Sequence, residues 1–261
     1  MSTNTSWRGR RWWPSGPPGW PIPVSPSAWR GNGWPVAELV LALDLPDART
    51  ALGLLDRVPN VRWVKLGSVL FTRTGSDFIA GLKARGHRVF LDLKWHDIPN
   101  TVEGAVRQAR DLGVDMVTIH ALGGPRMIEA AKVAGGGRVA VIAVTLLTSH
   151  GPDDLRAIYG QGPADIGAEV VRLAGMAVGA GADGVVSSPL EAARLRASLG
   201  PTALLVTPGI RGATDPAGDQ VRTATAQAAT EAGATHLVVG RPVLQADDPA
   251  AVWADLLGQV G

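Results

Sequence analysis

The sequence predicts an α/β protein, a single-domain (β/α)8 TIM barrel preceded by an irregular N-terminal extension. Its 261 residues are an ordinary length for one closed α/β barrel. Hydrophobic residues make up 46% and charged residues 18%, which is enough apolar material for a large core. From Glu38 onward, short β-branched runs alternate with stretches of helical period. Eight such pairs favour a closed parallel barrel over a doubly wound open sheet.

The eight units can be assigned in order along the chain. Runs rich in valine, isoleucine and leucine predict strands at 38–44, 62–67, 88–94, 116–121, 139–146, 184–188, 203–208 and 236–240. Helical periodicity predicts helices at 48–58, 75–85, 99–112, 124–134, 164–180, 190–199, 223–232 and 248–258. A further short helix is expected at 153–159, inside the long connection after the fifth strand.

Residues 1–35 differ in composition from the barrel, which we assign to residues 36–261. They contain six of the nine tryptophans, seven prolines and four arginines, with no acidic residue and no period of 2 or 3.6. We expect irregular or disordered structure there. No continuous apolar stretch resembles a signal peptide. Three interpretations stay open, namely a neutral extension, translation that begins near Val36, and a functional binding arm.

Composition excludes several classes of function. The chain has no cysteine, so it forms no disulfide or thiolate metal site, which fits a reducing cytoplasm. No window approaches 18 uncharged apolar residues, so we expect no membrane association by a spanning helix. Beyond residue 35 the charges nearly balance, so we expect no nucleic-acid partner. Only four of the 25 basic residues are lysine, and lysine can give up a proton where arginine cannot.

Charged residues stand at the C-terminal ends of the predicted strands, where barrel active sites form. Asp44 ends the first strand, and Lys65 lies near the end of the second. Asp92 and Lys94, two residues apart in the third strand, are expected to face the barrel mouth together, and Asp97 follows in the loop. A buried salt-bridge network is the alternative explanation, but burying several charges is costly unless all are paired. We therefore predict a catalytic site.

A phosphate site is predicted where the seventh and eighth strands end, because barrels commonly bind phosphate with the loops that follow these strands. Those ends read Thr207-Pro-Gly-Ile-Arg211 and Gly240-Arg241. Gly209 and Gly240 allow a close approach of the backbone, and the two arginines can supply forked hydrogen bonds. Either arginine alone would be explained as a surface charge, but their joint placement favours a phosphate ligand.

Three other patterns do not indicate a function. The stretch Gly179-Ala-Gly-Ala-Asp-Gly184 matches G-x-G-x-x-G, but it follows a helix and precedes a strand, which is the wrong order for dinucleotide binding. The five histidines show no metal-ligand spacing, although His120 ends a strand and could line the pocket. Ser149 and His150 are adjacent, which is no evidence for a catalytic dyad.

With these residues in place, the chain from about 38 to 260 resembles the orotidine 5′-phosphate decarboxylases. The most specific motif is Asp92-Leu-Lys-Trp-His-Asp-Ile-Pro-Asn-Thr101. The others are individually weak but follow in family order: Leu41-Ala-Leu-Asp44, Val64-Lys-Leu-Gly67, Leu147-Thr-Ser149, Thr207-Pro-Gly-Ile-Arg211, Gly218-Asp-Gln-Val-Arg222 and Val239-Gly-Arg-Pro242.

The resemblance implies decarboxylation of orotidine 5′-phosphate to UMP in pyrimidine biosynthesis, with no metal and no cofactor. Asp44 and Lys65 would hold the ribose hydroxyls, with Lys65 also part of the charged network. Asp92 would sit beside the substrate carboxylate, and Lys94 would protonate the carbon that loses CO2. Asp97 would complete the catalytic set.

The resemblance also implies how the rest of the substrate is bound. Thr148 would contact the pyrimidine. The phosphate would be held by Gln220, Arg241 and the amide of Gly240, and Arg211 would close over it.

A homodimer is implied as well, because Asp97 and Thr101 would reach into the neighbouring subunit's site.

Two departures from the family pattern stand out. Trp95 replaces the more usual Phe or Tyr and should point away from the mouth. The segment that begins at Thr223 lacks the proline expected near the start of its helix.

Two alternative functions stay open. Hexulose-phosphate synthases and ketogulonate-phosphate decarboxylases share the D-x-K-x-x-D core but use Mg²⁺. A catalytically inactive barrel, whose tryptophan-rich arm binds RNA or another partner, is the second alternative, and the intact charged residues argue against it.

Overall fold

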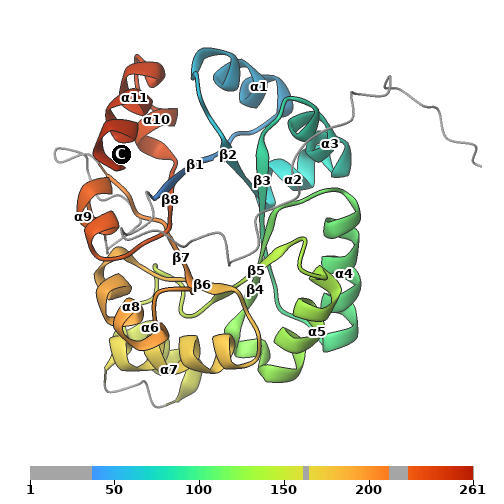
Figure 1. Ribbon diagram of the computed structural model, residues 1–261, viewed down its shortest axis with the longest axis vertical. Helices are drawn as coiled ribbons and strands as arrows, with labels where there is room; N and C mark the ends of the chain where they lie inside the picture. The colour runs from blue at the N-terminus through green and yellow to red at the C-terminus, as the bar shows by residue number, and fades with distance from the viewer. Residues whose placement is uncertain (1–36, 161–164, 212–222, 261) are drawn as a thin grey trace, which may run out of the picture.

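The structure is a computed structural model that describes residues 37–160, 165–211 and 223–260. Eight parallel strands close into a barrel in sequence order, and β8 pairs with β1 (Figure 1). The strands are β1 (Glu38–Ala42), β2 (Trp63–Gly67), β3 (Arg88–Trp95), β4 (Met116–His120), β5 (Ala140–Val144), β6 (Gly184–Val186), β7 (Leu204–Thr207) and β8 (His236–Val239). This confirms the predicted (β/α)8 barrel, and its closure excludes an open sheet. The extension predicted over 1–35 lies outside the described residues.

The helices surround the barrel (Figure 1). They are α1 (Ala48–Arg57), α2 (Ser68–Thr74), α3 (Ser76–Ala84), α4 (Pro99–Asp111), α5 (Pro125–Gly135), α6 (Pro152–Tyr159), α7 (Ile166–Gly179), α8 (Ala192–Leu199), α9 (Ala226–Glu231), α10 (Arg241–Leu244) and α11 (Pro249–Val260). Two 3₁₀ turns are η2 (Ala121–Gly123) and η3 (Pro189–Glu191). In the described part of the chain, no helix is long and apolar enough to cross a membrane.

Two helices were missed by the sequence analysis, α2 and α10. Both are short, and both begin where a strand ends at the barrel mouth. One turn or two of helix carries too few residues for a clear period, and α2 contains β-branched residues of modest helix propensity. The helix α2 ends at Gly75, whose φ of +65° is readily adopted by glycine.

Capping side chains explain two of the helix starts. Asp47 accepts a hydrogen bond from the Thr50 N–H at 2.9 Å and begins α1. Thr225 accepts from the Ala228 N–H at 3.2 Å, so α9 begins at Ala226 and not at the predicted residue 223. Thr225 thus supplies the start signal in the absence of the expected proline.

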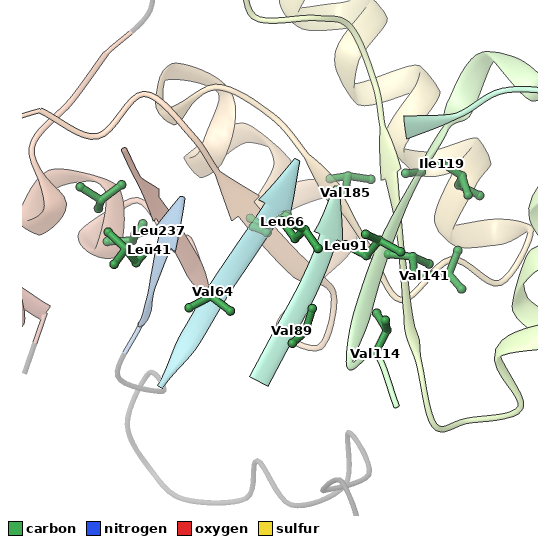
Figure 2. Close-up of a cluster of buried hydrophobic side chains, with 14 of the residues drawn as sticks. Leu41, Val64, Leu66, Val89, Leu91, Val114, Ile119, Val141, Val185 and Leu237 are labelled. Atoms are coloured by element: carbon green, nitrogen blue, oxygen red, sulfur yellow. The ribbon is translucent and has the colours of Figure 1, made fainter. Parts of the chain in front are cut away.

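Two layers of apolar side chains form the core, because alternate strand residues face opposite sides of the barrel wall. The outer layer lies between strands and helices and includes Leu41, Val64, Leu66, Val89 and Leu91 (Figure 2). The inner layer consists of Val40, Ala42, Trp63, Phe90, Met116, Ile142, Val206 and Val238. The next inward positions along β2 and β3 belong to Lys65 and Asp92, so the fold carries charge where its interior packing ends.

The N-terminal end of the barrel is joined by a repeated polar contact. Asp115, Asp183 and Thr235 each precede an even-numbered strand. Each accepts the backbone N–H of the preceding strand, at 2.8, 2.8 and 2.9 Å respectively. These bonds tie neighbouring strands together at the end opposite the barrel mouth, which is the end that usually serves stability.

Candidate active site

A cavity of about 490 Å³ opens at the C-terminal ends of the strands. This volume suits a small organic ligand. Its lining includes Asp44, Lys65, Asp92, Lys94, Thr148, Arg211, Gly240 and Arg241. The structure therefore brings together eight of the residues that the sequence predicted to form the site.

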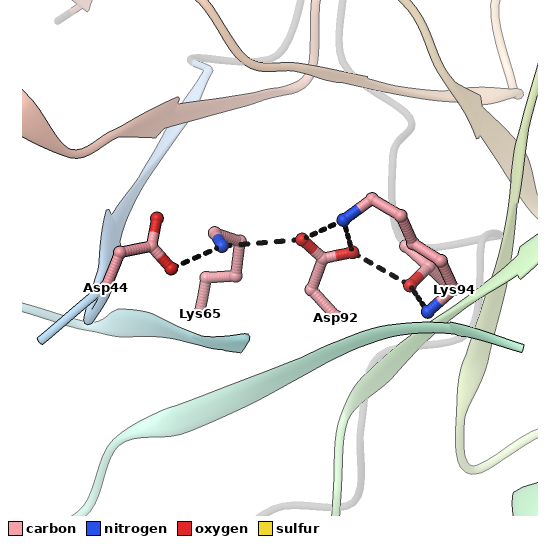
Figure 3. Close-up of polar contacts among 5 residues, drawn as sticks. Asp44, Lys65, Asp92 and Lys94 are labelled. Atoms are coloured by element: carbon pink, nitrogen blue, oxygen red, sulfur yellow. Dashed lines mark hydrogen bonds and ion pairs between the residues drawn. The ribbon is translucent and has the colours of Figure 1, made fainter. Parts of the chain in front are cut away.

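Four side chains form a line of alternating charge in this cavity (Figure 3). Lys65 Nζ lies 3.0 Å from Asp44 Oδ1 and 3.4 Å from Asp92 Oδ2. Lys94 Nζ lies 2.9 Å from both carboxylate oxygens of Asp92. The side chain of Asp92 is only 10% exposed, whereas that of Lys94 is 38% exposed. Asp92 is thus enclosed between two ammonium groups, and Lys94 has the more exposed side chain of the two lysines.

The charged state of this line follows from its geometry. Burial alone would raise the pKa of Asp92 and lower the pKa of Lys65, because it disfavours a charged form. The charges of Lys65 and Lys94 outweigh burial and hold the pKa of Asp92 below its usual value. Asp92 and Asp44 similarly hold the pKa of Lys65 above its usual value. Asp92 is therefore an anion and Lys65 a cation at neutral pH.

Stability alone does not explain such a network. A buried ion pair loses the solvation of both partners, and apolar side chains of similar volume often stabilise a core as well or better. The arrangement instead suits chemistry on a charged ligand, since it presents an anion and a cation side by side at a cavity wall.

Gly67, at the end of β2, leaves room for this network. A Cβ at this position would lie 3.0 Å from Asp44 Oδ1 and 3.2 Å from Lys65 Nζ. The two charged groups would therefore have to shift by a few tenths of an ångström to make room for alanine, which favours glycine at the end of Val64-Lys-Leu-Gly67.

The strand β3 departs from regular pairing at the site. Its pairing with β4 is regular up to Leu91 and resumes at Trp95. Between them Lys94 has a φ of +50°, in the left-handed region. Asp92 and Lys94 do meet, as predicted, but across an irregular strand and not through simple alternation. Trp95 lies beyond the irregularity and packs against the outer core, as expected.

Thr118 in β4 was missed by the sequence analysis. Its buried hydroxyl lies 2.9 Å from Asp92 Oδ1 and 2.9 Å from the backbone N of Lys94. An isolated polar residue in the apolar strand Met-Val-Thr-Ile-His was the available signal. Its partners come from another strand, so the sequence alone could not show what it contacts.

The opposite wall of the cavity is formed by the ends of β7 and β8. Gly209 has a φ of +87°, and this turn carries the chain to Arg211, which is buried and lines the cavity. Gly240 and Arg241 line it from β8 and α10. Two arginines thus face one cavity, as predicted. Gln220, the other predicted phosphate ligand, lies outside the described residues.

Asp97 and Thr101 do not line the cavity of their own chain. Both are exposed, Asp97 in the loop after β3 and Thr101 in the first turn of α4. Asp97 Oδ1 accepts a hydrogen bond from the Ile98 N–H at 2.6 Å. The neighbouring residue Ile98 is 66% exposed, so the loop after β3 and the start of α4 present both polar and apolar groups to the outside.

His120, which could have lined the pocket, does not belong to its lining. Its ring centroid lies 5.3 Å from that of His96. Burial, together with His96 and Lys94, lowers the pKa of His120. Among the residues that the structure describes, no three His, Asp or Glu side chains are grouped so that they could hold a metal ion.

Comparisons with known proteins agree on one family. The orotidine 5′-phosphate decarboxylase / HUMPS family matches residues 37–256. Orotidine 5′-phosphate decarboxylase of Halorhodospira halophila is 51% identical over 227 residues, which cover 85% of this chain and 95% of that protein. The enzyme of the same name from Alkalilimnicola ehrlichii is 51% identical over 224 residues, covering 84% and 94%.

A solved structure gives the same picture. The crystal structure of orotidine 5′-phosphate decarboxylase from Lactobacillus acidophilus matches with a TM-score of 0.76 and 36% identity. The match covers 86% of this chain and 99% of that one.

Proposed function

The chain belongs to the orotidine 5′-phosphate decarboxylase / HUMPS family, and from that premise we propose that it converts orotidine 5′-phosphate to UMP and CO2 in pyrimidine biosynthesis. The observation that carries the proposal is the ammonium of Lys94, held 2.9 Å from Asp92 and open to the cavity. A proton donor in that position is what replacement of a carboxylate by hydrogen requires.

The proposed reaction breaks the bond between C6 of the pyrimidine and its carboxylate. CO2 leaves, and the electron pair stays on C6 as a carbanion. The Lys94 ammonium stabilises the developing negative charge and then donates a proton to C6, which gives UMP. Lys94 is left as a neutral amine and regains its proton from water. Arginine could not readily serve here, because a guanidinium does not give up its proton.

Asp92 is proposed to lie beside the substrate carboxylate. Two like charges at close range repel each other, and this repulsion is relieved as CO2 leaves without charge. Lys65 and Lys94 keep Asp92 ionised, because both lower its pKa. The line of alternating charge therefore supports a role in the reaction for Asp92 and Lys65 as well as for Lys94.

The remaining lining residues are proposed to hold the rest of the substrate. Asp44, whose side chain is 53% exposed, would bind the ribose hydroxyls together with Lys65. Thr148 would contact the pyrimidine from the loop that follows β5.

The phosphate is proposed to bind at the wall formed by the ends of β7 and β8. Gln220, Arg241 and the Gly240 amide would hold it, and Arg211 would close over it. Arg211, Gly240 and Arg241 line the cavity, and Ile210 forms a bridge with Ala224 at either side of the segment that contains Gln220. Two guanidinium groups on one wall support an anionic ligand there.

A homodimer is part of the proposal. Asp97 and Thr101 would complete the site of the neighbouring subunit, and their exposure outside the cavity of their own chain supports this. We also propose that the enzyme acts in the cytoplasm and uses neither metal nor cofactor.

The test is conversion of orotidine 5′-phosphate by the purified protein, with and without EDTA. The reaction is monitored by the loss of orotidine 5′-phosphate absorbance and by the formation of UMP. Conversion that is unaffected by EDTA is expected. Conversion that EDTA abolishes would contradict the proposed metal-free reaction. No conversion by a folded protein would favour the Mg²⁺-dependent sugar-phosphate enzymes of the same family or an inactive barrel. Deletion of residues 1–35 then tests whether that segment binds RNA.

A further inference from the structure

Thr118 makes two hydrogen bonds that join the proposed catalytic pair. It lies within β4, and its side chain is fully buried. The hydroxyl donates to Asp92 Oδ1 at 2.9 Å and accepts from the backbone N–H of Lys94 at 2.9 Å. A hydroxyl has one proton to donate and lone pairs to accept, so a single side chain can make both bonds.

The second of these bonds replaces a missing backbone contact. Leu91 of β3 pairs with Val117 of β4, and Trp95 pairs with Ile119. The chain therefore advances four residues along β3 while it advances only two along β4. The Lys94 N–H therefore has no regular partner in the ladder and donates to the Thr118 side chain instead. A buried N–H that lost this bond would be left without a partner, which is strongly unfavourable.

The left-handed backbone of Lys94 needs such support. A φ of +50° is uncommon for any residue with a Cβ, and such a conformation persists only where its surroundings hold it. Since the backbone torsion of Lys94 sets where its side chain leaves the strand, it also sets where the ammonium reaches the cavity wall.

We propose that Thr118 is a positioning residue for the decarboxylation, which holds the Lys94 backbone in its left-handed conformation and orients the Asp92 carboxylate. This inference rests on the proposed function for its kinetic consequence. Thr118 does not line the cavity, so it acts through Asp92 and Lys94 and not on the substrate. Small misplacements of a reacting group are costly to turnover, whereas substrate binding by the remaining wall is left intact.

Two substitutions separate the hydroxyl from the shape of the side chain. Thr118→Val keeps the branched shape and removes both hydrogen bonds, and Thr118→Ser keeps the hydroxyl. The matched control is Thr235→Val, which removes a buried hydroxyl that bonds Leu205 at the opposite end of the barrel. Thr118→Ala, which cannot clash, replaces the valine variant if that protein does not fold.

Steady-state kinetics, the affinity for UMP and the crystal structure of each variant are then compared with those of the wild type. For Thr118→Val we expect kcat to fall about 10- to 100-fold, with KM and UMP affinity within about threefold of wild type. Thr118→Ser should recover most of kcat, and Thr235→Val should keep it. In the crystal structure of Thr118→Val, Lys94 should leave its left-handed conformation and its ammonium should shift away from Asp92.

The outcomes separate this inference from the proposed function. Unchanged kcat in a Thr118→Val protein, with active wild type, would overturn it, as would loss of kcat that serine does not recover. An inactive wild type would defeat the proposed function alone. The crystal structure still decides the positioning role in that case, and an unmoved Lys94 would refute it.

Discussion

The ammonium of Lys94 lies 2.9 Å from each carboxylate oxygen of Asp92, so both oxygens of Asp92 hold Lys94 at the cavity wall. Asp92 is in turn 3.4 Å from a second ammonium, that of Lys65. A lysine side chain is long and flexible, and these contacts restrict it to one place. The position of the proposed proton donor is therefore determined by the barrel wall.

Replacement of Lys94 by alanine should abolish turnover while the fold survives. The change removes both the charge that stabilises the carbanion and the proton donor, so kcat should fall by at least about 10³-fold. Lys132→Ala is the matched control, because Lys132 pairs with Asp183 at the other end of the barrel. Steady-state kinetics and circular dichroism are the measurements. Substantial turnover by a folded Lys94→Ala protein would disprove the assignment.

Mixing two inactive variants should restore activity if sites are shared between subunits. In a hybrid dimer of Lys94→Ala and Asp97→Ala, one site keeps its own Lys94 and receives an intact Asp97 from the partner. Random exchange should therefore return about a quarter of the wild-type activity, because roughly half of the dimers are hybrids with one intact site. Each variant alone is the control. No recovery after verified subunit exchange would mean that Asp97 does not serve the neighbouring site.

Arg241 should act through the substrate phosphate alone. Arg241→Ala should lower kcat/KM for orotidine 5′-phosphate roughly 10- to 150-fold, which corresponds to a hydrogen bond with a charged group of about 1.5–3 kcal/mol. With orotidine, which lacks the phosphate, the same substitution should have little effect. Arg126→Ala, an exposed arginine on α5, is the control. Equal losses with both substrates would contradict phosphate binding by Arg241.

Acid should destabilise the barrel through His236. Burial, and then the charges of Arg88 and Arg62, lowers the pKa of His236 to about 3. Below its unfolded pKa of about 6.5 the unfolded chain binds a proton that the folded protein does not, so stability falls as pH falls from 6.5 towards 3. By pH 5 the loss from this group is about 2 kcal/mol.

Urea unfolding at pH 7 and pH 5 measures this effect. His236→Gln should lose less stability than wild type between these pH values. His150→Gln, at the other end of the barrel, should lose as much as wild type. An unchanged pH dependence in a folded His236→Gln protein would show that other groups cause the acid sensitivity.

The sequence by itself determined the architecture and the order of the charged residues along it. Eight strand–helix periods predicted the closed barrel, because alternating and helical periods record which side of each element is buried. The rule that barrel sites form at the C-terminal ends of strands then predicted that Asp44, Lys65, Asp92 and Lys94 would meet, and they do. Each of these inferences needs only local pattern and strand order.

Only the tertiary structure decided how the site is held. Thr118 contacts Asp92 across 26 residues of sequence, and Lys94 adopts its left-handed backbone where the ladder between β3 and β4 is irregular. It likewise decided that Asp97 lies outside the cavity of its own chain, while Arg211 and Arg241 lie on one wall. A sequence period records burial, but hydrogen bonds between strands depend on their register. That register is determined by the packing of the whole barrel, so no local stretch of sequence contains it.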